Sequence, residues 1–133
     1  MENVGARDWT SVALHGPGYS GSTPLVKRAP LTPRKDVTAW HVYSVDWSPD
    51  TLTFRIDRDV VYRATKPMVE QYGGWAFDNP KFVILNVAIG GNYPQAVNGA
   101  RTPYPGLPES TVDLIKNNQM AMTVDWVRVT GKP

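Results

Sequence analysis

The amino-acid sequence predicts an all-β fold, an antiparallel β-sandwich, and three observations support this prediction. Short runs rich in Val, Ile and aromatic residues recur along the chain, turns rich in Gly and Pro separate them, and no stretch carries the sustained period of a long helix. The length of 133 residues is that of one domain, and 41% hydrophobic with 20% charged residues is an ordinary globular composition. We therefore expect one domain built around a single β core.

The N-terminal part of the chain predicts one strand followed by two loops. Residues Trp9 to Leu14 alternate well enough for a short strand, which ends at the sequence HGPGYSG of residues 15–21. Three glycines and a proline in these seven residues allow the backbone to approach a ligand closely, although most such loops are only turns. Residues Ser22 to Thr38 hold three prolines and four basic residues without a period, which indicates a surface loop with at most a short edge strand.

The middle of the chain predicts a three-stranded antiparallel meander. Its strands are expected at Trp40 to Trp47, with large side chains on both faces, at Thr51 to Asp57, where apolar and polar residues alternate, and at Val60 to Ala64. Residues 48–50, Ser-Pro-Asp, and residues 57–59, Asp-Arg-Asp, supply the two turns. The residues from Lys66 to Pro80 are expected to form a loop.

The longest apolar run, Phe82 to Ile89, predicts the central strand of the fold. It is rich in Val and Ile, is closed by Gly90 and Gly91, and is shorter than most helices, although periodicity alone leaves an apolar helix segment open. Asn86 is its single polar residue. A carboxamide in such a run is either hydrogen-bonded within the core or directed into a cleft, and the run itself favours neither.

The C-terminal part predicts a long connection and a closing strand. Residues Asn92 to Asn118 are expected to be mostly loop, with one or two helical turns at Glu109 to Ile115. Met120 to Val129 then alternates over ten residues and is expected to be a strand.

Composition disfavours several classes of partner. The net charge of +2 lacks the concentrated basic surface that nucleic-acid binding needs, and no apolar run approaches the length that spans a bilayer, so we expect neither nucleic acid nor membrane as a partner. The N-terminus of this chain shows no signal-peptide pattern. There is no Cys and there are only two His, which disfavours a transition-metal site. Five Trp and six Tyr offer flat apolar rings that suit sugar stacking, although most buried Trp is simply core.

Four phrases resemble a known family when taken together and in order: LHGPGYSG, WHVYSVDWSPDTLTFRID, FDNPKFVILNVAIGGNYP and TVDWVRV. They are similar to the C-terminal half of family 16 glycoside hydrolases, in particular the laminarinase-like endo-β-1,3-glucanases. The resemblance implies a concanavalin-like jelly roll of two curved antiparallel sheets, whose concave face binds a β-glucan in a cleft. Residues 1–133 would form the C-terminal half of one such domain, so the jelly roll is expected to be partial.

The resemblance also implies a catalytic group at the start of the chain. Met1-Glu2 matches the end of the family motif E-x-D-x-x-E, so Glu2 corresponds to the general acid/base and the nucleophilic glutamate would lie before residue 1. A retaining glycosidase needs two carboxyl groups about 5–5.5 Å apart, so this chain alone is expected to be inactive. His15 matches a family histidine on the strand beside the catalytic one, so the resemblance places it near the acid/base as a second catalytic candidate, although a lone His is more often structural. No cofactor is required for this chemistry.

Further residues are assigned by the resemblance to substrate and metal binding. Asn86 matches the family's cleft asparagine, and Trp75, Tyr19 and Tyr93 lie in loops that would rim the cleft, with Trp75 the first choice for sugar stacking. Asp125 matches a residue that helps hold a structural calcium in many members, but calcium takes six to eight oxygen ligands. An exposed Asp125 paired with Arg128 or Lys132 is an equal alternative.

We therefore expect an extracellular hydrolase that cleaves β-1,3-glucosidic bonds in laminarin-like β-glucans with retention of configuration. Its partners would be a β-glucan and either the N-terminal half of the same domain or a second copy of the chain. Two alternatives remain: a non-catalytic β-glucan-binding sandwich, and an inactive fragment that associates through open sheet edges.

Overall fold

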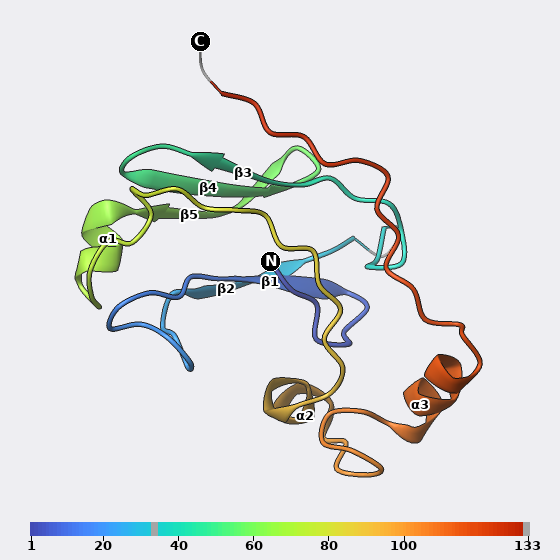
Figure 1. Ribbon diagram of the computed structural model, residues 1–133. Helices are drawn as coiled ribbons and strands as arrows, with labels where there is room; N and C mark the ends of the chain where they lie inside the picture. The colour runs from blue at the N-terminus through green and yellow to red at the C-terminus, as the bar shows by residue number, and fades with distance from the viewer. Residues whose placement is uncertain (33–34, 132–133) are drawn as a thin grey trace. The chain divides into compact units, whose positions relative to one another are not determined.

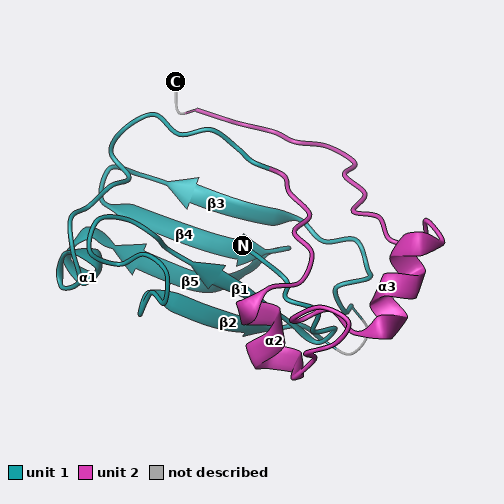
Figure 2. Ribbon diagram, turned by 60° about the horizontal axis from the view of Figure 1, so that its bottom comes forward, with its two compact units in different colours: residues 1–84 teal, residues 85–133 magenta. Residues whose placement is uncertain are grey.

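The computed structural model describes residues 1–32 and 35–131 and divides into two compact units, residues 1–84 and 85–133 (Figure 2). It consists of five short strands and three short helices. The strands are β1 (Trp9–Ala13), β2 (Val26–Pro30), β3 (Tyr43–Trp47), β4 (Thr51–Ile56) and β5 (Asp59–Thr65). The helices are α1 (Lys66–Glu70), α2 (Asn92–Asn98) and α3 (Glu109–Lys116). In the described part of the chain no helix is long and apolar enough to cross a membrane.

All five strands lie in the first unit and form two small antiparallel sheets (Figure 1). β1 pairs with β2 in the register Trp9↔Pro30 to Ala13↔Val26. β3, β4 and β5 form the predicted meander, with a register shift between Phe54 and Arg55. The prediction of antiparallel sheets is thus confirmed for this unit, which also holds the short helix α1. The complete jelly roll remains a prediction, as does the assignment of residues 1–133 to half of one domain.

Local sequence explains the ends of the meander strands. At the first turn the Ser48 backbone N–H donates to the Thr51 carbonyl at 2.9 Å, and the Ser48 hydroxyl donates to the Asp50 carboxylate at 3.0 Å. At the second turn Asp57 has a φ of +56°, a left-handed conformation that Asp tolerates better than most residues. The prediction that the first strand begins at Trp40 is wrong by three residues. The Asp57 carboxylate accepts a hydrogen bond from the Val42 N–H at 3.1 Å, so a side chain holds the backbone just before β3 begins.

One hydrophobic core joins the two sheets of the first unit. It contains residues from β1, β4, β5 and α1 and from the loops beside β1 and β2: Val12, Leu14, Tyr19, Leu25, Leu52, Ala64 and Val69. Helix α1 was not predicted, since residues 66–80 were assigned to a loop. Pro67 suits the first turn of a helix because its φ is preset there, and Val69 on the same helix is fully buried.

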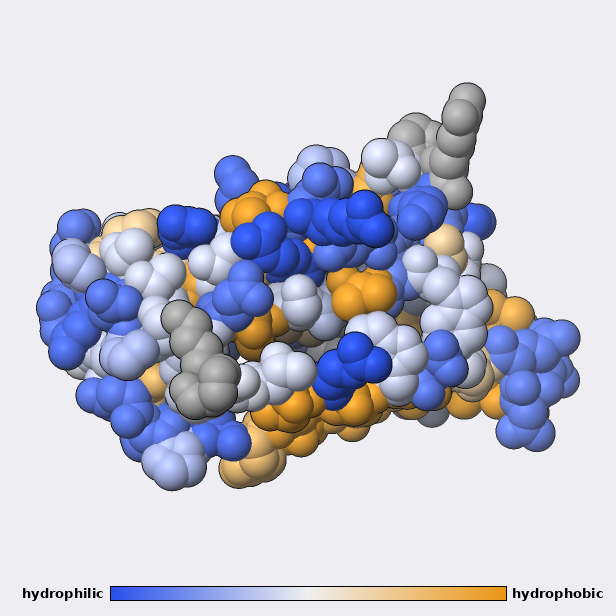
Figure 3. Space-filling model, turned by 90° about the horizontal axis from the view of Figure 1, so that it is seen from above, coloured by the Kyte–Doolittle hydropathy of each residue, from blue (hydrophilic) through white to orange (hydrophobic). Residues whose placement is uncertain are grey.

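The predicted central strand, Phe82 to Ile89, is wrong for this structure. The run is irregular and exposed throughout, with Phe82 at 84% and Ile84 at 69% exposure. The predicted closing strand, Met120 to Val129, is likewise irregular and exposed. A strand exists only when a neighbouring strand accepts its hydrogen bonds, and no described residue pairs with either run. Figure 3 shows hydrophobic residues, in orange, reaching the surface in that view.

The second unit contains two helices within a long connection. α3 confirms the helical turns expected at Glu109 to Ile115. α2 lies in a region assigned mostly to loop. It ends at Gly99, whose φ of +73° is the left-handed conformation that commonly terminates a helix.

Candidate functional site

Glu2 lies along the edge of β1 that faces away from β2. Its backbone N–H donates to the Ser11 carbonyl at 2.9 Å and its carbonyl accepts from the Ser11 N–H at 2.8 Å. The Thr10 hydroxyl also donates to the Glu2 carbonyl, at 2.8 Å. The N–H and C=O groups of a strand residue point to the same side of the strand, and those of Ser11 point toward Glu2. Arg28 of β2 is the partner of Ser11 on the other side. The Ser11 hydroxyl donates to the Glu2 carbonyl at 3.3 Å. Four hydrogen bonds therefore fix the backbone of Glu2, and the residue is exposed.

Cross-strand pairing places the Glu2 and Ser11 side chains on the same face of the pleat. Val12 and Leu14 point to the opposite face and are buried in the core. His15 stands four residues beyond Ser11, which corresponds to about 13 Å along an extended chain. The structure thus brings Ser11, and not His15, opposite Glu2, and the catalytic role assigned to the exposed His15 stays a prediction.

Tyr19 is a core residue in this structure, and its predicted contact with substrate stays a prediction. Its side chain is 1% exposed, and its hydroxyl donates to the Gly74 carbonyl at 3.0 Å. Burial raises the pKa of the Tyr19 phenol. A Cβ atom on Gly16 would overlap the Tyr19 ring. The first glycine of the HGPG sequence therefore leaves room for the Tyr19 side chain and not for a ligand.

The same loop is held against the segment that carries Trp75. The Gly74 N–H donates to the Pro17 carbonyl at 3.1 Å, and a Cβ atom on Gly73 would overlap that carbonyl. Trp75 is half-buried against the core, and its ring meets Phe77 edge-on, with centroids 5.0 Å apart and planes at 74°. The Trp75 Nε1 atom is buried and has no hydrogen-bond partner among the described residues. A buried donor of this kind costs about 1–3 kcal/mol unless water or a ligand satisfies it.

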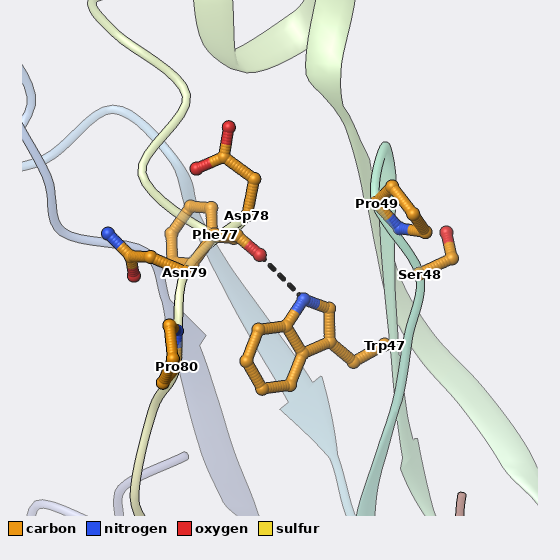
Figure 4. A pocket seen from close by; sticks show the side chains of 7 residues that line it. All are labelled: Trp47, Ser48, Pro49, Phe77, Asp78, Asn79 and Pro80. Carbon is orange, nitrogen blue, oxygen red and sulfur yellow. Dashed lines mark hydrogen bonds between the residues drawn. The ribbon is translucent and has the colours of Figure 1, made fainter.

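A pocket of about 330 Å³ adjoins this segment, and the sequence did not predict it (Figure 4). Its walls come from the turn after β3 and from the segment after Trp75: Trp47, Ser48, Pro49, Phe77, Asp78, Asn79 and Pro80. The Trp47 indole Nε1 donates to the Phe77 carbonyl at 2.7 Å. The two walls are far apart in the sequence and meet only in the folded chain, so the sequence alone does not predict the pocket.

A second polar cluster surrounds His41. Its ring is 2% exposed, with Nδ1 at 3.1 Å from the Asp57 carboxylate and Nε2 at 3.0 Å from the Asp36 carbonyl. The Val42 backbone N–H, followed by the His41 and Lys35 side chains, holds the pKa of Asp57 below its ordinary value. Hydrogen bonds from Thr38, together with the Arg7 guanidinium, lower the pKa of Asp36 to about 2. The cluster joins the segment before β3 to the β4–β5 turn. Its His41 ring is buried, whereas the Asp57 side chain is 34% exposed.

Comparison with known protein families gives a match over most of the chain. The family described as "Glycosyl hydrolases family 16" matches residues 1–128. The chain belongs to this family.

Curated relatives of this family 16 chain act on more than one glycan, according to their names. It is 34% identical over 97 residues to a Rhodothermus marinus protein named beta-glucanase, a match that covers 68% of this chain and 34% of the relative. It is 33% identical over 98 residues to "Glucan endo-1,3-beta-glucosidase A1" of Niallia circulans, covering 68% of this chain and 12% of the relative. It is 28% identical over 98 residues to "Keratan-sulfate endo-1,4-beta-galactosidase" of Sphingobacterium multivorum, covering 74% and 19%.

The matched part spans about a third or less of the length of each of these relatives. No solved structure gave a significant match. Family membership is therefore established, while the comparisons leave open which glycan is bound and which bond is cut.

The remaining predicted site residues of the family 16 chain lie in the second unit. Asn86 is exposed in the irregular run, and Tyr93, 38% exposed, stands in the first turn of α2. Their predicted contacts with substrate stay predictions.

The calcium role of Asp125 stays a prediction. Asp125 is exposed in an irregular segment, and residues 1–32 and 35–131 hold no group of three His, Cys, Asp or Glu side chains that could bind a metal. The Arg128 guanidinium lies over the Trp126 ring, 5.5 Å from its centroid. The other predicted partner of Asp125, Lys132, is outside the described residues.

Proposed function

We propose that this family 16 chain supplies the acid/base half of a retaining glycosidase that cleaves β-1,3-glucosidic bonds in β-glucans. The observation that carries the proposal is Glu2. It occupies the position that resembles the family's acid/base, its backbone is fixed against β1 by the contacts to Ser11 and Thr10, and it is exposed. The names of two relatives, a beta-glucanase and a glucan endo-1,3-beta-glucosidase, support glucan as the substrate.

In this mechanism Glu2 acts twice. It first protonates the glycosidic oxygen while a second carboxylate attacks the anomeric carbon. It then removes a proton from the water that attacks the glycosyl-enzyme, and the sugar is released from the second carboxylate. The second carboxylate must stand about 5–5.5 Å from Glu2. We place it upstream of residue 1, on an extension of the segment that pairs with Ser11, with a β-bulge that brings both carboxyl groups to one face. The chemistry uses two carboxyl groups and no cofactor.

The proposal includes an extracellular location, where polymeric glucans occur, and substrate contacts by Asn86, Trp75 and Tyr93. Trp75 is supported best, because its half-buried ring is fixed by Phe77 and its indole N–H lacks a partner in the described chain. A partner for that donor could be a sugar hydroxyl or a water molecule.

The first prediction tests Glu2. The chain alone should release no reducing ends from a linear β-1,3-glucan, and the chain joined to its upstream half should do so. Glu2→Gln in the joined protein should lower kcat at least about a hundredfold with little change in glucan binding, because general acid–base groups act mainly in the transition state. Glu70→Gln, at an exposed glutamate of α1, is the matched control and should leave kcat unchanged.

Two results would contradict the proposal. Turnover by the isolated chain that Glu2→Gln abolishes would show that the second carboxylate lies within residues 1–133. Glucan binding without turnover in the joined protein would favour the non-catalytic binding sandwich.

A further inference from the structure

The pocket beside Trp47 joins a fixed aromatic ring to exposed polar side chains. Trp47 ends β3 and is followed by Ser48 and Pro49, while Phe77 to Pro80 form the facing wall. All of these residues belong to the first unit. The lining does not include Glu2 or His15, so the pocket is separate from the proposed acid/base.

The Trp47 ring is held in place and is still accessible. Its Nε1–H donates to the Phe77 carbonyl at 2.7 Å, which fixes the orientation of the indole, and the residue remains 47% exposed. Figure 4 shows the ring with the Asn79 and Pro80 side chains on one side and Ser48 and Pro49 on the other. An aromatic ring that is already ordered loses little side-chain freedom when a ligand stacks on it.

Asp78 and Asn79 give the pocket a polar rim. Both residues are exposed and line the pocket. In Figure 4 the Asp78 carboxylate points up from this wall, and the Asn79 carboxamide extends away from the Trp47 ring. A carboxylate accepts hydrogen bonds, and a carboxamide both donates and accepts them, a combination that matches neighbouring hydroxyl groups on a sugar ring. The volume of about 330 Å³ is at the lower end of the range of small-molecule sites.

We propose that this pocket is an accessory binding site for a glucosyl unit of a β-glucan chain. The apolar face of the sugar stacks on Trp47, and its hydroxyls bond to Asp78 and Asn79. The choice of glucan as ligand rests on the proposed function. The site itself rests on the fixed indole, the polar rim and the size of the pocket.

The test measures binding without hydrolysis. Laminarihexaose, a linear β-1,3-linked hexasaccharide, is titrated into the chain by calorimetry. Trp47→Ala should weaken binding at least about fivefold, the range expected for a lost aromatic contact, while Trp47→Phe, which keeps a flat ring, should weaken it less. Asn79→Ala should weaken binding about threefold and, being a surface change, should leave the melting temperature unchanged.

Trp40→Ala is the matched control, because Trp40 is 65% exposed and lies outside the pocket, and its affinity should equal that of the parent. Full affinity in both Trp47→Ala and Asn79→Ala would overturn the proposal, as would a parent chain that does not bind the hexasaccharide. Failure of the proposed function gives a different result: the joined protein would lack turnover while the Trp47-dependent binding persisted.

Discussion

Tyr19 shows how far a single residue can be interpreted from sequence. An aromatic residue in a loop of glycines and proline suits a ligand rim, and the resemblance assigned it there. Its actual environment depends on Gly74, 55 positions away, whose carbonyl accepts from the Tyr19 hydroxyl. Because such a long-range partner leaves no local pattern, the sequence could identify the loop but could not tell whether its aromatic ring faces inward or outward.

The second prediction follows from this burial. Tyr19→Phe keeps the ring and removes the hydroxyl, which leaves the Gly74 carbonyl without its donor, so the free energy of unfolding should fall by about 1–3 kcal/mol in urea denaturation. Tyr104→Phe, at a tyrosine that is 60% exposed, is the control and should change stability by less than about 0.5 kcal/mol. An unchanged stability together with weaker glucan binding would instead place Tyr19 on a rim.

At the scale of elements, the hairpins were predictable and the longer pairings were not. β4 and β5 alternate in polarity, are joined by a short turn, and pair with neighbours that are close in sequence. The run from Phe82 to Ile89 has stronger strand character than either, yet it is irregular here, because apolar side chains predict burial without supplying the strand that must lie alongside. Of the candidate site, the sequence provided Glu2 and Trp75. It missed Ser11 and the Trp47 pocket, which arise only from pairing and from loop contact.

The third prediction concerns the contact between β3 and the β4–β5 turn. Asp57 has a lowered pKa in the folded chain, so the stability that its charge provides is present above the unfolded pKa of about 3.9 and is lost as the pH falls through the folded pKa. Acid titration of the melting temperature below about pH 4 should therefore show a decline that Asp57→Asn reduces. Asn keeps the tolerance for a left-handed backbone at this position.

Asp59→Asn, beside the same turn, serves as the comparison, because it removes a charge without removing the hydrogen bond from the Val42 N–H to Asp57. Asp36 also has a lowered pKa, so part of the acid decline should survive in Asp57→Asn. An identical profile for the parent and Asp57→Asn would show that this charge contributes nothing to holding the turn against β3.

For the whole molecule, the exposed apolar residues set the main constraint. The uncovered side chains in the irregular runs include Phe82 at 84%, Ile84 at 69%, Val87 at 56% and Val129 at 82% exposure. Exposed apolar patches beyond a few hundred Å² are rare on monomeric proteins and usually mark an interaction surface. At about 25 cal/mol per Å², leaving even about 400 Å² uncovered forfeits roughly 10 kcal/mol, which is comparable to the stability of a domain. We therefore expect the described chain to be stable only with a partner that covers these runs.

The fourth prediction is that the purified chain is a dimer or larger assembly, or is held by the upstream half of its domain. Light scattering should give a mass above that of one 14.8 kDa chain, and the double variant Ile84→Lys with Val87→Lys should lower that mass, because a charge cannot be buried cheaply in the contact. Met68→Lys, at a single exposed methionine of α1, should not lower it. A monodisperse parent monomer with a cooperative melt would show that residues 1–133 close a core unaided.

Two glycines set where the proposed sugar-stacking residue Trp75 stands, although neither offers a side chain to a ligand. Gly16 leaves room for the Tyr19 ring, and Gly73 lets the Pro17 carbonyl lie against the backbone that leads into Trp75. Position 75 therefore tolerates substitution better than Gly16 and Gly73 do. An aromatic residue at position 75 could be exchanged for another ring to suit a different glycan, whereas a methyl group at either glycine would separate the two loops and displace whichever ring stood there. In a family whose members act on several glycans, specificity can diversify through the half-buried ring at position 75 while both glycines stay fixed.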